Sequence, residues 1–299
     1  MRLTFCKIGA VLLLTIFGYL TQVRPGMLRV VFCDVGQGDA ILLIDGSKQV
    51  LVDTGQDQSI LHCLEESLPF WDKTLDLVVL THPDYDHIGG FLSLAEQYEI
   101  DGIMYLPLKP DTRIAEQVLE EIHRLSANNT EIYLPIQGML LKASPRVQLE
   151  VINPFFPFSL VEECKIEITE TSLWDKKSCF LSKNIVSKYS KNNLSIALNV
   201  HIGDVTMFLS GDLESEAELA LIAAKSLHRV DILKVGHHGA KTGTTKEILE
   251  VLQPERAIVS VGKNNNYSHP SSQVLQRLEG TGSRVYRTDQ LGSIEFLLK

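Results

Sequence analysis

The sequence predicts an α+β protein built as a four-layer αββα sandwich, with two β-sheets face to face and helices on the outside. Two observations predict this fold. The chain has two halves, 28–152 and 194–287, and each begins with β-rich segments and continues with alternating strand and helix patterns. Some strand candidates, such as 75–80, are apolar at almost every position, which is typical of strands buried on both faces. A hydrophobic N-terminal segment precedes this body.

The first half is expected to contain seven strands, at 28–35, 40–44, 49–52, 75–80, 103–106, 131–134 and 147–152. Asp45-Gly46, between the second and third of these, is a strong hairpin signal. Helical periodicity predicts helices at 59–68, 91–98 and 114–125. The strand at 147–152 is expected to close this half.

The second half is expected to contain strands at 194–202, 205–209, 231–235, 257–261 and 284–287, with helices at 214–224, 245–252 and 272–278. Between residues 153 and 192 the pattern weakens into a stretch rich in Phe, Pro and Lys, without any repeat. We interpret this stretch as a long surface excursion.

The N-terminus differs from the rest of the chain. After Arg2 and Lys7 comes the apolar run 8–20, which suits the core of an export signal better than a full membrane span of about 20 residues. We therefore expect residues 1–26 to form a signal or membrane anchor, and 27–299 to form one domain outside the cytoplasm. A buried N-terminal helix is the alternative, and the sequence does not separate a cleaved signal from an anchor.

Charge and cysteine content limit the classes of function. The net charge of −9 argues against broad electrostatic capture of nucleic acid. Residues 226–299 differ, because they hold ten Lys and Arg against seven Asp and Glu. This excess of basic residues indicates either a local basic rim or an ordinary solvated surface. The five irregularly spaced cysteines, Cys6, Cys33, Cys63, Cys164 and Cys179, indicate buried small apolar residues rather than a disulfide framework. Only Cys164 and Cys179 are close enough in sequence to suggest a bridge. No phosphate-binding G-x-x-x-x-G-K loop is present, so we expect no nucleotide cofactor.

The sharpest motif is His82-Pro83-Asp84-Tyr85-Asp86-His87, directly after a strand expected to be buried. A loop after a strand can turn several side chains toward one point, whereas a strand would alternate them between two faces. Imidazole and carboxylate together suit a divalent ion of intermediate hardness. A helix N-cap could explain one of the aspartates, but not two His and two Asp together.

Four further candidates follow other predicted strands: Asp212, His237, His238 and His269. Asp212 alone could cap the next helix, and a lone His is usually an ordinary surface or core residue. Because the first cluster needs further ligands, the whole set of six to eight donors predicts a site for two metal ions.

The chain from about residue 28 to the C-terminus resembles the metallo-β-lactamase superfamily, whose signature is H-x-H-x-D-H. It is most similar to the C-terminal hydrolase domain of the ComEC family of DNA-uptake proteins. Eight segments carry this resemblance: Asp34–Ala40, Asp53–Gly55, Thr81–Gly90, Asn192–Ser195, Ser210–Glu214, Lys234–Gly239, Tyr267–Pro270 and Tyr286–Asp289. Asp84 stands where most of the superfamily has a second His.

The resemblance implies the metallo-β-lactamase fold and a ligand set shared by two ions. It assigns His82 and Asp84 to the first ion, Asp86 and His87 to the second, Asp212 to a bridging position, and His237 to the last ligand position. His238 and His269 become candidates for contacting or protonating the substrate. Asn193 falls near the place of a further His. A carboxylate at position 84 hardens the site, so both Zn²⁺ and Mn²⁺ are expected candidates.

We therefore expect a phosphodiesterase or nuclease related to DNA uptake, in which Asp86 orients a water activated by two metals. Lys234, Lys241 and Lys263 are either phosphate contacts or ordinary surface lysines. Expected partners are DNA or another phosphodiester, the membrane through 1–26, and the uptake machinery. Two alternatives stay open: hydrolysis of a cell-surface phosphodiester or other small ester, and a non-catalytic partner of an uptake assembly. β-Lactam hydrolysis is less expected because of Asp84.

Overall fold

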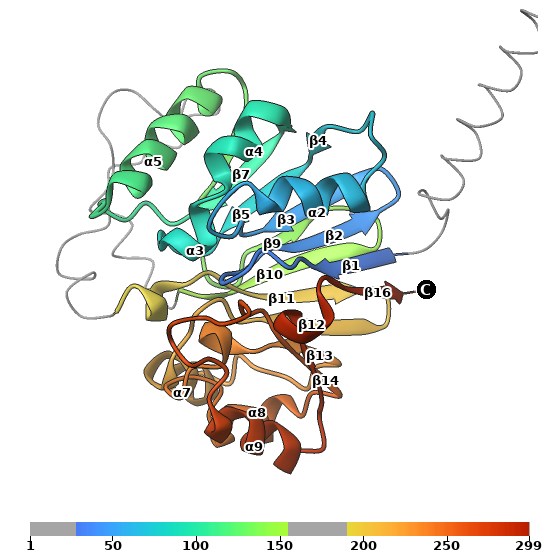
Figure 1. Cartoon of the computed structure of the whole chain (residues 1–299), viewed down its shortest axis with the longest axis vertical. Helices are drawn as coiled ribbons and strands as arrows, with labels where there is room; N and C mark the ends of the chain where they lie inside the picture. Colours follow the sequence, from blue (N-terminus) through green and yellow to red (C-terminus); the bar gives the residue numbers. More distant parts are fainter. Residues whose placement is uncertain (1–27, 155–189, 299) are drawn as a thin grey trace, which may run out of the picture.

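The computed structural model describes residues 28–154 and 190–298 of the 299-residue chain (Figure 1). The expected anchor at 1–26, most of the expected surface excursion, and both Cys164 and Cys179 lie outside the described residues. Within the described part of the chain, no helix combines the length and the apolar character needed to cross a bilayer.

Two seven-stranded sheets form the centre of the molecule. The first sheet has the order β16 (Ile294–Leu298), β1 (Leu28–Phe32), β2 (Ile41–Asp45), β3 (Lys48–Val52), β5 (Leu77–Leu80), β7 (Gly102–Tyr105) and β8 (Glu131–Tyr133). The second sheet has the order β15 (Arg284–Arg287), β14 (Arg256–Val259), β13 (Ile232–Lys234), β12 (Val205–Leu209), β11 (Ala197–Ile202), β10 (Val147–Asn153) and β9 (Leu140–Lys142). A small third pair joins β4 (Thr74–Leu75) to β6 (Glu99–Ile100).

Helices cover the outer face of each sheet (Figure 1). Those over the first sheet are α2 (Ser59–Ser67), α4 (Phe91–Gln97) and α5 (Arg113–Ser126), with the short α3 (Tyr85–Ile88) beyond the carboxyl end of β5. Those over the second sheet are α7 (Ser215–Ala223), α8 (Lys246–Leu252) and α9 (Ser272–Gly280). The described residues also contain the short helix α10 (Thr288–Leu291) and two 3₁₀ turns, Asn192–Leu194 and Gly236–Gly239. The predicted four-layer α+β sandwich is confirmed.

An apolar core lies between each pair of adjacent layers. One lies between the first sheet and its helices, one between the two sheets, and one between the second sheet and its helices. In β1, Val30 and Phe32 pack between the sheets, while Val31 packs toward the helices. Side chains on a strand alternate between its two faces, and here both faces are buried. This double burial explains the continuous apolar runs in the sequence.

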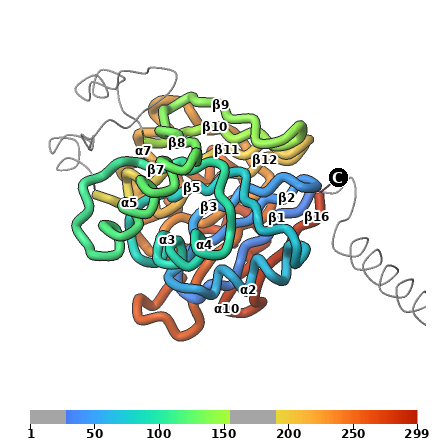
Figure 2. The backbone as a smooth tube through the Cα atoms, turned by 90° about the horizontal axis from the view of Figure 1, so that it is seen from above, coloured from blue at the N-terminus to red at the C-terminus, as the bar shows by residue number. Residues whose placement is uncertain are grey.

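Three strands, β9, β10 and β16, cross the expected division into halves. The strand predicted to close the first half is β10, but it pairs with β11 in the second sheet, with Leu149 opposite Val200. Conversely, the unpredicted strand β16 returns to the first sheet and pairs with β1 along its whole length. Figure 2 shows β16 next to β1. The expected boundary between the halves was therefore wrong, because apolar periodicity marks a strand but not the sheet that it joins.

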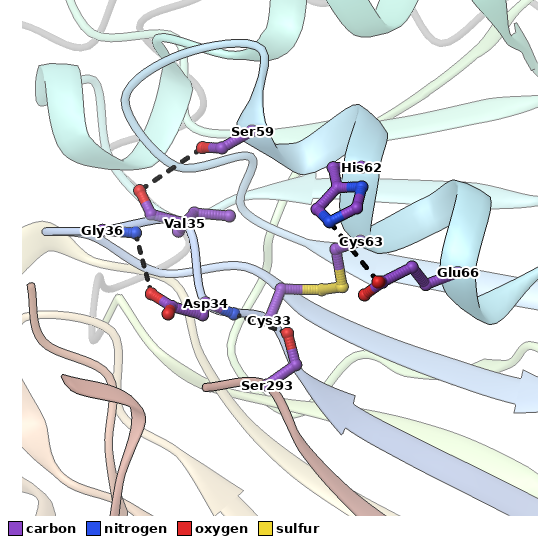
Figure 3. The surroundings of a disulfide bond; sticks show 9 residues. All are labelled: Cys33, Asp34, Val35, Gly36, Ser59, His62, Cys63, Glu66 and Ser293. Atoms are coloured by element: carbon purple, nitrogen blue, oxygen red, sulfur yellow. Dashed lines mark hydrogen bonds and ion pairs between the residues drawn. A yellow bond between two sulfur atoms is a disulfide. The ribbon is translucent and has the colours of Figure 1, made fainter. Parts of the chain in front are cut away.

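Cys33 and Cys63 form a disulfide bond, with their Cα atoms 5.8 Å apart (Figure 3). The interpretation of the cysteines as unpaired apolar residues was wrong for these two. Cys33 directly follows β1 and Cys63 lies in α2, so the packing of α2 on the first sheet joins residues that are 30 positions apart. The bond fixes the start of the loop that leads to Asp39.

Candidate metal centre

The loops that carry the predicted ligands meet at one end of the two sheets. The parallel strands β3 and β5 of the first sheet end at Asp53 and at the 82–87 motif, and β12 and β13 of the second end at Asp212 and at 236–239. Ligand sites of such sheets form outside the carboxyl ends of the strands. The structure thus brings the His82–His87 motif together with Asp212 and the paired histidines.

His87 is held by a buried carboxylate that the sequence analysis did not assign. Its Nδ1 lies 2.7 Å from Asp53 Oδ2, and Asp53 also accepts hydrogen bonds from the backbone N–H and the hydroxyl of Thr81, both at 2.7 Å. A carboxylate on one ring nitrogen orients the imidazole and leaves the other nitrogen free to bind a metal. His87 Nε2 accordingly lies 3.3 Å from Asp212 Oδ2.

His82 lies beside His87, with ring centroids 4.1 Å apart. Its Nδ1 is 3.1 Å from the Thr81 hydroxyl and 3.3 Å from the Ser195 hydroxyl. Its Nε2 is 3.8 Å from carboxylate oxygens of both Asp84 and Asp212. The ring is therefore oriented in the same way as His87, with its outer nitrogen toward the acidic cluster.

The loop before β2 holds the 84–87 segment in place. Asp39 N–H donates to the Asp86 carbonyl at 3.2 Å. Gly38, at a φ of 129°, lies so close to Asp86 that an added Cβ would collide with the same carbonyl. Only glycine allows this close backbone approach.

His238, rather than His237, completes the cluster. His238 is 1% exposed, and its Nδ1 donates to the Ser260 carbonyl at 2.9 Å. Its Nε2 lies 3.3 Å from Asp86 Oδ2 and 3.4 Å from Asp212 Oδ2. His238 thus lies within the groups of candidate ligand atoms and His237 does not, while the ligand role of His237 stays a prediction.

His237 turns toward the accessible side of the centre, with 25% of its side chain exposed. Its Nδ1 is 3.4 Å from both Glu214 Oε1 and Asn192 Nδ2, and its Nε2 is 3.8 Å from Asp212 Oδ2. Both histidines have left-handed backbone angles, with φ of 47° and 53°. This turn separates the two adjacent side chains, and a sequence pattern does not reveal it.

Four buried side-chain atoms at the centre have no hydrogen-bond partner among the described residues: His82 Nε2, His87 Nε2, His238 Nε2 and Asp212 Oδ1. Buried polar atoms without partners are costly, and they need an explanation such as an ion. Candidate ligand atoms lie within 4.8 Å of one another in four groups of the described residues. Two of these groups are His82–His87–Asp212 and Asp86–His87–His238, and the other two include Asp39. Imidazole and carboxylate donors in this arrangement fit divalent metal ions.

The carboxylates also shift the titration of the imidazoles. Burial would lower the pKa of His87 and His238, but Asp212, with a second carboxylate beside each ring, raises each pKa well above its usual value. Burial, together with the neighbouring His87, lowers the pKa of His82 to about 4. Metal binding displaces protons from such ligands. A bound cation would therefore take the place of these protons and offset the negative charge of the same carboxylates.

Asp84 lies between the centre and a lysine. It occupies the N-cap position of α3, but its side chain makes no capping hydrogen bond. One oxygen faces His82, and the other lies 2.8 Å from Lys191 Nζ, which also contacts Asp111 Oδ2 at 3.1 Å. Lys191 was not predicted, because it lies at the end of a stretch without a recognisable pattern.

Three residues predicted to bind substrate differ in their surroundings. Lys234 is 0% exposed and pairs with Asp39 Oδ2 at 2.7 Å, so it is neither a phosphate contact nor a surface lysine. Asn193 is buried, and its amide bonds to Glu214 N–H and to Glu216, which directs it away from a ligand role. Lys241 is exposed, as a substrate contact or a surface lysine would be.

His269 lies at the outer side of the centre, with its ring centroid 5.7 Å from that of His237. Burial and the neighbouring His237 lower its pKa from the usual value. Asp39, Asp53 and Asn192 lie within the motifs that carry the family resemblance, but no role was predicted for them. Their positions at the ends of predicted strands were the available signal.

Comparisons with known proteins identify related sequences. Residues 33–148 match the family model described as the Metallo-beta-lactamase superfamily. ComE operon protein 3 of Bacillus subtilis is 30% identical over 288 residues, which cover 89% of this chain and 32% of that protein. Competence protein ComA of Neisseria gonorrhoeae is 28% identical over 265 residues, which cover 88% of this chain and 31% of that protein. The chain thus spans about a third of the length of these relatives.

The fold also matches solved structures. The metallo-beta-lactamase fold protein YhfI from Bacillus subtilis superposes with a TM-score of 0.56 and covers 90% of this chain and 99% of its own. The two sequences are 12% identical, so this likeness concerns the fold alone.

Proposed function

We propose that this chain, a metal-dependent hydrolase that matches the metallo-β-lactamase superfamily model over residues 33–148 and is similar to bacterial competence proteins, hydrolyses phosphodiesters, with DNA as its substrate. The observation that carries the proposal is the convergence of buried, unpartnered imidazole and carboxylate atoms on one point. The proposal further specifies two ions. His82, Asp84 and Asp212 would hold one, and Asp86, His87, His238 and Asp212 would hold the other.

The charge of the centre supports two ions rather than one. Lys234 pairs with Asp39, and Lys191 pairs with Asp84. Among the ion pairs of the described residues, none joins Asp53, Asp86 or Asp212 to a Lys or Arg. These three carboxylates thus have only imidazoles as charged partners in a largely buried site, where a charge without sufficient pairing is expensive. Two divalent cations would offset it and leave a positive site for a phosphodiester anion.

The bound ions would supply Lewis acidity and lower the pKa of water to about 7. The remaining steps belong to the protein. Asp86 keeps a charged carboxylate because His238 and His87 lower its pKa although burial raises it. This charged carboxylate can accept a hydrogen bond from the attacking water and so orient it. His237 and His269, on the accessible side, are placed to contact the phosphate and to give a proton to the leaving oxygen, a role worth roughly 10²–10⁴-fold in rate.

The proposed location is outside the cytoplasm, with residues 1–26 as the anchor or export signal. The disulfide between Cys33 and Cys63 supports this location, since disulfides persist in oxidising compartments. The relationship to competence proteins further leads us to propose DNA-uptake machinery as the partner.

The test uses the purified full-length chain with Mn²⁺ or Zn²⁺, assayed on DNA, a chromogenic phosphodiester and a β-lactam. Asp212→Ala is compared with Asp204→Ala as the matched control. Both residues flank β12, but Asp204 lies in the exposed turn at the other end of that strand. Metal-dependent cleavage of DNA by the parent chain and by Asp204→Ala, lost in Asp212→Ala, is the expected result.

Other results would replace the proposal. Activity on the small diester alone would favour a small-ester hydrolase. Metal binding without turnover of any of the three substrates would indicate a non-catalytic partner of an uptake assembly.

A further inference from the structure

A continuous series of aromatic rings leads from the buried centre to the surface. The ring centroids of His82 and His87 are 4.1 Å apart, those of His87 and His238 are 5.2 Å apart, and those of His238 and His237 are 6.2 Å apart. Beyond His237 come His269, at 5.7 Å, and then Tyr267, at 5.6 Å from His269. The mechanism above uses every ring of this series except Tyr267.

Tyr267 is a flat ring that is held in place but exposed. It is 66% exposed, and its ring is stacked on His269 with an interplanar angle of 25°. Since the imidazole covers one face and most of the side chain is accessible, the opposite face is available for a ligand. A single exposed aromatic residue normally needs no explanation. This one differs because it lies three ring contacts from His238, a proposed metal ligand.

Asn265 fixes the loop that presents Tyr267. The Asn265 side chain accepts hydrogen bonds from the backbone N–H groups of Tyr267, at 3.1 Å, and His269, at 3.0 Å. It also donates to the backbone carbonyls of His269, at 2.8 Å, and Gly262, at 3.1 Å. A ring whose backbone is fixed in this way loses little conformational entropy when a ligand stacks on it.

The exposed face of Tyr267 suits a planar, uncharged group, and the neighbouring centre suits an anion that is linked to this group. We propose that Tyr267 is a stacking platform for an unpaired nucleobase, whose phosphodiester lies toward His269 and His237; this inference rests on the proposed phosphodiesterase function. Stacking on an aromatic side chain tolerates any base, because every base has a π-face. The platform therefore favours single-stranded nucleic acid, since bases in a duplex are already stacked on one another. Lys263, exposed in the same loop, supplies a local positive charge for the backbone.

The test measures binding without turnover. The full-length chain is titrated in EDTA with a fluorescent oligothymidine, and in parallel with an abasic oligonucleotide of the same length. We expect Tyr267→Ala to weaken binding of the oligothymidine about fivefold or more and to leave binding of the abasic strand unchanged. Tyr267→Phe, which keeps the ring, should stay within about twofold of the parent.

Phe70→Ala is the matched control. Phe70 is 74% exposed, but it precedes the start of β5, whereas the centre follows the end of that strand. We expect this variant to bind both oligonucleotides like the parent chain. Thermal unfolding of each variant verifies that the fold is intact.

Two outcomes would overturn the platform: unchanged binding in Tyr267→Ala, or an equal loss for both oligonucleotides, which would assign the ring a purely structural role on His269. The proposed hydrolysis is tested separately. If Tyr267-dependent base binding is found in a chain that cleaves no phosphodiester with Mn²⁺ or Zn²⁺, the stacking platform stands and the proposed function fails.

Discussion

Replacing Lys234 by Met tests how the centre is supported from within. Lys234 is 0% exposed and Asp39 is 1% exposed, and the Nζ atom lies 2.7 Å from Asp39 Oδ2. Methionine keeps the length and apolar stem of the side chain but removes the charge. The Asp39 carboxylate would then remain buried without a charged partner other than the nearby histidines.

The expected cost follows from this geometry. Removing one partner of a buried ion pair typically costs about 3–5 kcal/mol, because the remaining charge is still excluded from water. For a chain of this size, such a loss lowers the melting temperature by roughly 10 °C. Urea unfolding, with its slope compared between variants, measures the free energy of unfolding. Lys241→Met, at an exposed lysine, is the control and should change it by less than about 0.5 kcal/mol.

The double variant Lys234→Met/Asp39→Leu separates stability from function. Because an apolar pair of similar volume can replace a buried ion pair without loss, most of the stability should return. Metal affinity should not return with it. Asp39 Oδ1 lies 3.3 Å from His238 Nδ1, and the loss of such an orienting partner typically costs 10–100-fold in metal affinity. A Lys234→Met variant as stable as the parent chain, or a double variant with full metal affinity, would refute this reasoning.

Three further perturbations test other parts of the structure. Asp53→Asn should weaken metal binding about 10–100-fold by calorimetry, because the amide no longer orients His87 as a carboxylate does; unchanged affinity would rule out this orienting role. Cys33→Ser, which opens a disulfide spanning 30 residues, should lower the free energy of unfolding in urea by about 3–4 kcal/mol, and a loss below 1 kcal/mol would contradict the bond. Burial would raise the pKa of Asp45, but hydrogen bonds from Arg146 and a neighbouring serine lower it. Asp45→Asn should therefore cost about 1 kcal/mol at neutral pH. Because the folded-state pKa is lowered, this difference should begin to shrink as the pH falls below the unfolded-state pKa of about 4 and should be lost as the pH falls through the folded-state pKa. A difference that stays constant throughout this acid titration would exclude the charge as its source.

Much of the fold followed from apolar periodicity. The four layers and the strand-to-loop position of the His82–His87 motif were predicted because both depend on local patterns. The sheet that each strand joins depends on long-range pairing. The exchange of β10 and β16 between the two halves therefore had no local signal.

The candidate site was predictable by residue type but not by orientation. His237 and His238 are adjacent, and only the left-handed backbone at both decides which imidazole faces inward. The position of Lys234 at the end of a predicted strand does not reveal that its side chain is buried. The burial depends on the ion pair with Asp39, which lies almost 200 residues earlier in the chain. The disulfide was missed for a similar reason, since helix packing rather than spacing brings Cys33 and Cys63 together.

The metal content of the full-length chain is the most direct test of the centre. After dialysis against Zn²⁺ or Mn²⁺, elemental analysis should find about two ions for each parent chain. It should find fewer in His238→Ala, while His237→Ala should keep the parent's number. Parent, His238→Ala and Asp212→Ala chains with equal metal content would contradict the assignment of these buried imidazoles and carboxylates to a metal centre.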